Sequence, residues 1–172
     1  MKVVKISVLA GAVAAALVMG SVQAAAPAAS PSTTLNAGTS VAAKCTTLTA
    51  TAITFDAYVP DEANDNTKDT TLTVRCTLNT PITIAMDKGT NGSSTSARKL
   101  LITTNGRSDT LNYNLYSDSA RSILWGEGSN KVSGTGEGLL KTSTYNVYGK
   151  IPAEQDVTPG SYADAVTVTV AY

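Results

Sequence analysis

The chain of 172 residues carries 13 basic and 13 acidic side chains, two cysteines and no histidine. A balanced charge argues against nucleic acid and anionic membrane surfaces as partners, because both select for a basic patch. The lack of histidine excludes Ser-His-Asp and Cys-His catalysis and histidine-ligated metal sites, so we expect neither an enzyme nor a bound cofactor.

The first 24 residues have the pattern of a secretory signal peptide. Lys2 and Lys5 precede an apolar run over residues 6–19, and residues 22–24 fit a small-residue cleavage site. The run is shorter than the roughly 20 residues needed to span a bilayer, which argues against the alternative, a retained membrane anchor. We therefore expect cleavage after Ala24, which leaves 11 basic and 13 acidic residues and a formal charge of −2.

Residues 25–37 differ in composition from the rest of the chain. They consist mainly of Ala, Pro, Ser and Thr, and Leu35 is the one large apolar side chain among them. So few apolar groups give little to hold the segment against a core. We predict a flexible N-terminal arm over residues 25–37, followed by a single domain over residues 38–172.

Short runs of alternating apolar residues follow the arm, and none keeps a helical period for three turns. The runs cover residues 41–45, 53–55, 72–76, 82–86, 100–102, 111–115 and 144–150. Polar, Gly-rich and Asn-rich turns separate them, notably at residues 61–66, 88–92 and 159–160. The pattern predicts an all-β, antiparallel sandwich.

The last eleven residues alternate most regularly. Val166, Val168, Val170 and Tyr172 share one parity, while the threonines between them take the other. This is the pattern of a half-buried strand. The strand runs to the final residue, so we expect its outer edge to lack a partner within the chain. Proteins either protect such an edge or use it to bind another chain, and we expect the second.

Cys45 and Cys76 are the two cysteines of a chain predicted to be exported, which predicts a disulfide bond between them rather than two free thiols. The bond would close a loop of about 30 residues and stabilise the fold by roughly 3–4 kcal/mol. The wide spacing does not favour a redox role, which would place the two cysteines in a Cys-x-x-Cys motif.

Two polar segments resemble binding sites only in part. Residues 61–66 are rich in Asp and Asn, but a calcium-binding EF-hand loop would need Gly and Glu where the chain has Asn66 and Leu72. The glycine-rich stretch over residues 126–138 is followed by no helical pattern, as a phosphate-binding loop would require. We expect a solvated turn in the first case and a surface loop in the second.

Aromatic residues gather in the second half of the chain and leave two interpretations open. They comprise Tyr113, Tyr116, Trp125, Tyr145, Tyr148, Tyr162 and Tyr172. Packing in the core and at strand ends is the commoner use of such rings. The alternative is a stacking platform for sugars, which would make the protein a secreted, monomeric coat-like or carbohydrate-binding module.

An ordered set of motifs resembles the spore coat protein U domain family, which includes the pilin subunits of archaic chaperone–usher pili. The resemblance covers residues 39–172, nearly the whole predicted domain. The matching segments are residues 98–101 (Arg-Lys-Leu-Leu), 111–118, 125–126, 147–152, 155, 160–164 and 166–172.

The resemblance implies an immunoglobulin-like antiparallel sandwich that lacks its last strand. A strand from a periplasmic chaperone would fill the resulting groove first, and the N-terminal arm of a neighbouring subunit would then replace it. Groove and chaperone contacts are expected at Val166, Val168, Val170 and Tyr172. The donor strand is expected to include Thr33, Leu35 and Ala37 and to extend toward Val41, because the small residues and prolines of the arm supply few apolar groups.

The same resemblance implies a structural rather than a catalytic role. Subunits would be exported through the periplasm, pass an outer-membrane usher and polymerise head to tail with copies of themselves or related pilins. The product would be a surface fibre for attachment or biofilm formation. The chain shows no second domain of the kind expected in a tip adhesin, so we expect a shaft subunit.

Overall fold

The computed structural model describes residues 29–104 and 106–172 of the chain. The predicted signal peptide, residues 1–24, lies outside them, as does the beginning of the arm. Residues 40–172 form one compact unit. Residues 29–39, described by themselves, are exposed and contain no helix or strand. In the part of the chain that the structure describes, no helix is long and apolar enough to cross a membrane.

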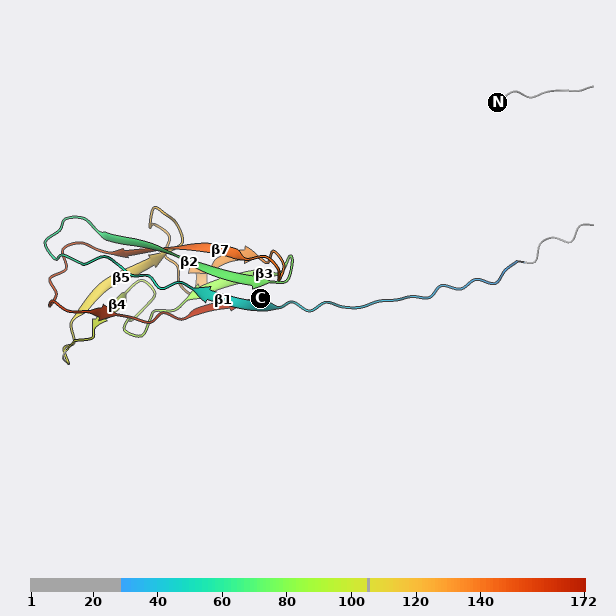
Figure 1. Ribbon diagram of the computed structural model, residues 1–172, viewed down its shortest axis with the longest axis horizontal. Coiled ribbons are helices and arrows are strands. Elements are labelled where there is room, and N and C mark those ends of the chain that lie inside the picture. The colour runs from blue at the N-terminus through green and yellow to red at the C-terminus, as the bar shows by residue number, and fades with distance from the viewer. Residues whose placement is uncertain (1–28, 105) are drawn as a thin grey trace, which may run out of the picture. The chain divides into compact units, whose positions relative to one another are not determined.

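Nine strands make up the compact unit (Figure 1). They are β1 (Cys45–Ala50), β2 (Asn66–Cys76), β3 (Pro81–Met86), β4 (Arg98–Ile102), β5 (Thr110–Tyr116), β6 (Val132–Thr135), β7 (Ser143–Ile151), β8 (Tyr162–Ala163) and β9 (Val168–Ala171). Apart from the short 3₁₀ helix η1 (Gly128–Asn130), the described residues contain no helix.

The strands form two sheets that share one hydrophobic core. One sheet has six strands in the order β1-β2-β7-β5-β4-β8, and the other has three in the order β6-β3-β9. All strand pairs are antiparallel. Leu72 of β2, Ile84 of β3 and Leu111 of β5 belong to the same buried cluster. The predicted antiparallel sandwich is confirmed.

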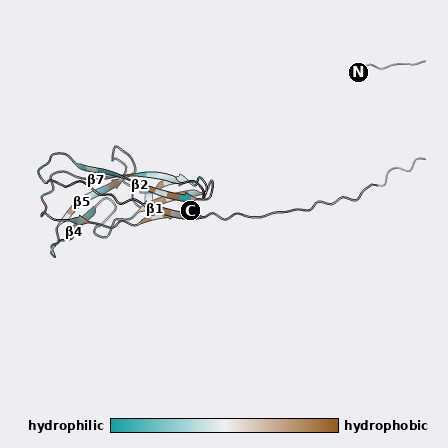
Figure 2. Cartoon of the chain, in the orientation of Figure 1, coloured by the Kyte–Doolittle hydropathy of each residue, from teal (hydrophilic) through white to brown (hydrophobic). Residues whose placement is uncertain are grey.

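Side-chain alternation explains why the strands form where they do. In β2, Leu72 and Val74 are fully buried while Arg75 is exposed, and in β7, Val147 and Ile151 are buried. Because successive side chains of a strand point to opposite faces, each strand gives one apolar face to the core. Hydrophobic and hydrophilic residues accordingly alternate along the strands in Figure 2.

Three segments differ from the sequence-based predictions. The first strand begins at Cys45, and residues 41–44 are exposed and unpaired in the sheet. Residues 53–55 turn two side chains inward but belong to no strand. Residues 132–135, predicted as part of a surface loop, form β6 and pair with β3. Gly134 is needed in β6, since a Cβ there would lie 2.0 Å from the Tyr145 hydroxyl.

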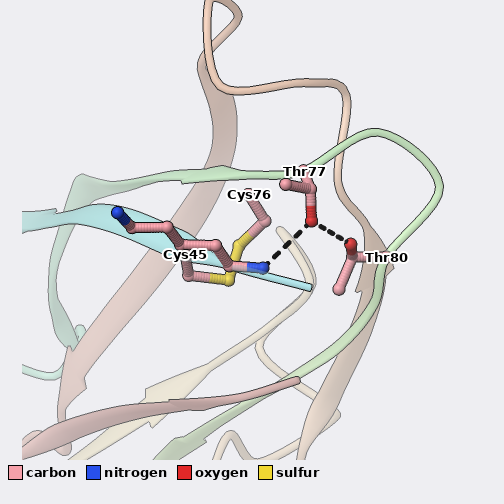
Figure 3. Close-up of a disulfide and its surroundings, with 5 residues drawn as sticks. Cys45, Cys76, Thr77 and Thr80 are labelled. Atoms are coloured by element: carbon pink, nitrogen blue, oxygen red, sulfur yellow. Dashed lines mark hydrogen bonds between the residues drawn. A yellow bond between two sulfur atoms is a disulfide. The ribbon is translucent and has the colours of Figure 1, made fainter. Parts of the chain in front are cut away.

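The predicted disulfide is confirmed at the start of the sandwich. Cys45 and Cys76 are bonded to each other and are also the first residue pair of the β1–β2 ladder. The backbone around the bond is tied as well, because Thr77 Oγ1 accepts a hydrogen bond from the Lys44 amide (3.1 Å) and contacts Thr80 Oγ1 (2.5 Å; Figure 3). The bond therefore fixes the edge strand β1 against β2.

Candidate functional site

An apolar groove of about 860 Å³ runs along the sandwich between two wall segments. The first wall consists of residues 50–58, which continue β1. The second wall consists of residues 157–168, which include β8 and the start of β9. The floor consists of core side chains, among them Leu72, Met86, Leu111, Leu115, Val147 and Ile151. The walls contribute half-buried side chains, among them Ile53, Phe55, Tyr58, Val157, Tyr162, Val166 and Val168. Half-buried apolar walls over a buried apolar floor make this the main binding surface that the described residues offer.

The first wall leaves β2 where the β1 ladder ends. In the last two hydrogen bonds, the Thr51 amide donates to the Thr71 carbonyl (3.1 Å) and the Thr70 hydroxyl donates to the Thr51 carbonyl (2.9 Å). Among the described residues, 52–58 form no backbone-to-backbone hydrogen bond. Tyr58 holds the far end of the wall, because its hydroxyl contacts both the Pro152 carbonyl and the Gln155 amide. Apart from the Asp56 carbonyl, which accepts a hydrogen bond from the Asn66 side chain (2.8 Å), backbone donors and acceptors along the wall therefore remain available to another strand.

A glycine in the sheet below lets the first wall lie close to the core. A Cβ on Gly149 of β7 would lie 2.3 Å from Ile53 Cδ1 and 2.8 Å from Phe55 Cζ. The Phe55 ring also meets the Tyr113 ring edge-to-face, with centroids 6.3 Å apart. The first wall can therefore lie this close to the core because residue 149 is a glycine and has no side chain.

The second wall crosses from one sheet to the other. Tyr162 and Ala163 of β8 pair with β4, whereas Val168 begins β9, which pairs with β3. Asp164 holds the crossing: its Oδ1 accepts hydrogen bonds from the Thr90 and Asn91 amides (2.9 and 3.1 Å). The other carboxylate oxygen of Asp164, Oδ2, accepts a hydrogen bond from the Tyr113 hydroxyl at 2.7 Å. Burial and this bond raise the Tyr113 pKa.

A second carboxylate and a buried arginine complete this cluster. Asp87 Oδ1 accepts hydrogen bonds from the Gly89 and Thr167 amides, both at 2.9 Å. Burial raises the Asp87 pKa, but the two amides outweigh it, and the pKa lies below its ordinary value. Arg98 is fully buried, which lowers its pKa. Its guanidinium donates to four backbone carbonyls, those of Met86, Asp87, Thr95 and Trp125.

This polar cluster positions the backbone and presents no reactive group to the groove. The charged atoms of Asp87, Arg98 and Asp164 are all engaged with backbone amides, carbonyls or the Tyr113 hydroxyl. Within residues 29–104 and 106–172, no group of three His, Cys, Asp or Glu side chains could hold a metal ion. What the site can do chemically is bind an extended apolar segment.

The predicted groove residues occupy different positions in the structure. Val166 and Val168 line the groove. Val170 packs against the core but is outside the groove lining, and Tyr172 follows β9 with 60% of its surface exposed. Thr169 points outward, as the alternation predicts. Strand β9 pairs with β3 on one edge, and within the described residues no strand pairs with its other edge.

The predicted donor residues lie in the part of the arm that the structure describes. Thr33, Leu35 and Ala37 are exposed and in no secondary structure, and Leu35 is 91% exposed. Val41, which has the same parity along the chain, is also exposed. Their role as donors stays a prediction.

Sequence reasoning missed several wall residues. Tyr58, Val157 and Tyr162 line the groove, but no periodic pattern singles them out, since the segments that carry them are irregular. Phe55 was predicted within a strand, and its alternation with Ile53 is the signal that could have indicated an inward-facing wall. The hydrogen bonds of Asp164 to residues more than 70 positions away left no signal in the local pattern.

The aromatic residues are used mainly in the core. Trp125 is only 1% exposed, its indole N–H donates to the Ile84 carbonyl at 3.0 Å, and its ring packs on that of Tyr145. Tyr113 and Tyr116 are buried too. The core packing favoured from the sequence is confirmed for these three residues, and Trp125 cannot serve as a stacking platform for sugars.

Comparison with known proteins assigns the chain to a family. Fold and groove define an all-β, immunoglobulin-like antiparallel sandwich, and the family model described as Spore Coat Protein U domain matches residues 32–169. The chain belongs to this family. It is 37% identical over 107 residues to Protein U of Myxococcus xanthus. That match covers 59% of this chain and 58% of Protein U.

Two solved structures resemble the chain. One is the crystal structure of the CsuC–CsuE chaperone-tip adhesion subunit pre-assembly complex from the archaic chaperone-usher Csu pili of Acinetobacter baumannii. It matches with a TM-score of 0.57 and 20% identity over 77% of this chain and 40% of that chain, and the likeness shows the fold. The E. coli Hda pilus minor tip subunit HdaB matches with a TM-score of 0.41 and 16% identity, over 74% and 79% of the two chains.

Proposed function

We propose that this protein is a structural pilus subunit whose groove accepts a strand from another chain. One observation carries the proposal: the apolar groove lies between a wall with free backbone hydrogen-bonding groups and the open edge of β9. An unpaired strand edge beside an uncovered apolar surface is unfavourable in an isolated protein. An added strand would pair the open edge and cover the apolar surface, because its backbone would bond to the edge while alternate side chains entered the groove.

A periplasmic chaperone is the first partner under this proposal. The structural relative from Acinetobacter baumannii is a pilus subunit in a pre-assembly complex with a chaperone. A chaperone strand in the groove would keep β9 and the first wall from pairing with other chains during export. An outer-membrane usher would then exchange the chaperone for the next subunit. The disulfide agrees with a route through an oxidising compartment.

The donor strand under this proposal is the exposed segment before β1. Thr33, Leu35 and Ala37 share one parity, and Thr39 and Val41 continue it. A strand over residues 33–41 would be about 27 Å long at about 3.3 Å per residue. The first wall, residues 50–58, contains the same number of residues. The proposed donor strand can therefore supply one residue for each residue of the first wall.

An arm and a groove on the same chain lead to a fibre. Each copy would give one strand and receive one, and this head-to-tail contact does not close on itself. We place the fibre on the cell surface, with a role in attachment or biofilm formation.

The test is deletion of residues 25–37 in a chain that is exported together with its chaperone. The deletion removes residues 33–37 of the proposed donor strand but leaves the groove, so the variant should fold, bind the chaperone and fail to polymerise with itself. As a control, Ile123→Ala changes an exposed apolar residue outside the arm and should polymerise normally. Continued polymerisation of the deletion variant would refute the assignment of the arm as donor.

A further inference from the structure

The strand ends around the disulfide form one end of the sandwich, which we call the disulfide end. It comprises residues 41–44, 75–81, 135–143 and 171–172. The pairs Cys45–Cys76, Pro81–Thr135 and Thr83–Ala171 bring these segments together. In the view of Figure 1, the beginning of β1 and the C-terminus lie at the same end of the sandwich.

Exposed apolar side chains gather at the disulfide end. Eight large hydrophobic side chains are exposed among the described residues, and besides Val41, the last residue of the proposed donor strand, three of them lie here: Leu78 (68%), Leu140 (97%) and Tyr172. A cleft of about 310 Å³ lies between residues 41–43 and 77–81. Apolar groups that gather on a surface in this way indicate a contact with another protein.

The opposite end carries the opposite charge. We call it the acidic end and define it as residues 56–66, 106–109 and 152–156, which meet where β2 begins beside the end of β7. Its carboxylates at positions 56 and 65 are paired with Lys68 and Lys150. Four further acids are exposed: Asp61, Glu62, Glu154 and Asp156. Arg107 is the exposed base among the described residues of this end.

The disulfide end is basic by comparison. Lys44, Arg75 and Lys141 are exposed there, against the single acid Glu137. Two surfaces of opposite charge at opposite ends of one unit favour head-to-tail contact between copies, because like ends would repel. The charge pattern thus selects both the partner and its orientation.

We propose that the disulfide end docks on the acidic end of a second copy of this chain. The inference rests on the proposed function, and the chain length supports it. If Val41 is the last donor residue in the groove, the three residues 42–44 separate it from Cys45 at the start of β1, a span of about 14 Å at most. The two compact units must then touch.

Strand direction determines which ends touch. Strand β9 runs toward the disulfide end, since Ala171 pairs with Thr83 near the start of β3. All strand pairs here are antiparallel, and a donor antiparallel to β9 would leave the groove at the acidic end of the acceptor. The disulfide end of the donor copy would then face the acidic end of the acceptor, as the charges require.

The test applies a zero-length carbodiimide cross-linker to assembled full-length protein and identifies the joined peptides by mass spectrometry. We expect amide bonds that join Lys44 or Lys141 of one copy to Asp61, Glu62, Glu154 or Asp156 of another. The double variant Lys44→Glu/Lys141→Glu removes both reacting amines and should abolish these cross-links, so it serves as the negative control. Adding Asp61→Lys and Glu62→Lys should restore cross-linking with the charges exchanged, whereas Lys131→Glu, outside both ends, should change nothing.

Two independent readouts separate this inference from the proposed function. Strand insertion is detected by oligomers that resist SDS without heating. The end-to-end contact is detected by the cross-links. SDS-resistant oligomers without these cross-links would overturn the docking inference and leave the proposed function intact. Without SDS-resistant oligomers the proposed function fails. In that case, cross-links between folded copies still test the end-to-end contact. Their absence would overturn the docking inference as well.

Discussion

The core is closed around Trp125 and open along the groove, and the two regions differ in how their polar groups are satisfied. Around Trp125, the indole N–H and the Arg98 guanidinium donate to the backbone carbonyls of five loop and strand residues. Along the groove, residues 52–58 form no backbone-to-backbone hydrogen bond within the described chain. Both regions lie over the same apolar cluster.

The difference teaches where this fold can accept another chain. Buried polar groups must be paired, and the region around Trp125 does this internally, so a partner could gain little there. The groove wall keeps most of its backbone groups unpaired beside apolar side chains, so an added strand gains hydrogen bonds and buried surface together. The following predictions alter one region or the other.

The largest effect is expected from a charge in the groove. Val168→Asp places a carboxylate on the groove lining, where no described side chain can pair with it, and should abolish both chaperone binding and polymerisation. Thr169→Asp, the next residue of β9, points outward and should assemble normally. Pull-down with the chaperone and SDS gels without heating measure both steps. Normal assembly of Val168→Asp would contradict the groove as the binding site.

The closed region should respond in stability. Trp125→Ala removes a fully buried ring and the donor to the Ile84 carbonyl, so we expect a loss of about 3–5 kcal/mol in the free energy of unfolding. Urea denaturation of the chaperone complex of the variant, compared with that of the unmodified protein, measures it. Leu140→Ala, at an exposed site, should cost very little. A loss below about 1 kcal/mol for Trp125→Ala would show that the ring does not close the core.

Removing the disulfide tests the edge strand that leads into the first wall. Changing both Cys45 and Cys76 to Ala should lower the free energy of unfolding by roughly 3–4 kcal/mol in the chain-entropy model. Reduction of the unmodified protein should give a comparable loss. Unchanged stability under both treatments would mean that the β1–β2 ladder holds the edge without the bond.

The smallest effect is expected from acid. The amides of Gly89 and Thr167 keep the Asp87 pKa low in the folded protein, so the carboxylate stabilises the fold fully above its unfolded pKa of about 3.9. This stability is lost as the pH falls from there through the lower folded value. Unfolding curves of the unmodified protein and Asp87→Asn should converge over that acidic range. A difference that does not depend on pH would contradict the assignment.

The sequence predicts those parts of the fold that depend on local alternation. Strands β2, β3 and β5 and the inward face of Val166 and Val168 follow from period-two patterns, and the cysteine count predicts the disulfide. The match to residues 32–169 also confirms the family suggested by the motifs.

The parts that could not be predicted depend on contacts between distant segments. Residues 132–135 form a strand because β3 offers an edge, although glycine and serine favour a loop. Segment 51–58 alternates like a strand, yet it leaves β2 and is held by Tyr58 on residues near 152–155. Asp164 fixes the second wall through a loop 74 residues earlier. No window of neighbouring residues contains this information.

The most direct measurement of the central claim is size-exclusion chromatography with electron microscopy of the processed protein, expressed with and without a periplasmic chaperone. An incomplete sandwich should be recovered only as a one-to-one complex with the chaperone and should form SDS-resistant oligomers or thin fibres once released. A stable monomer obtained without the chaperone would contradict the account, because the groove would then need no strand from another chain.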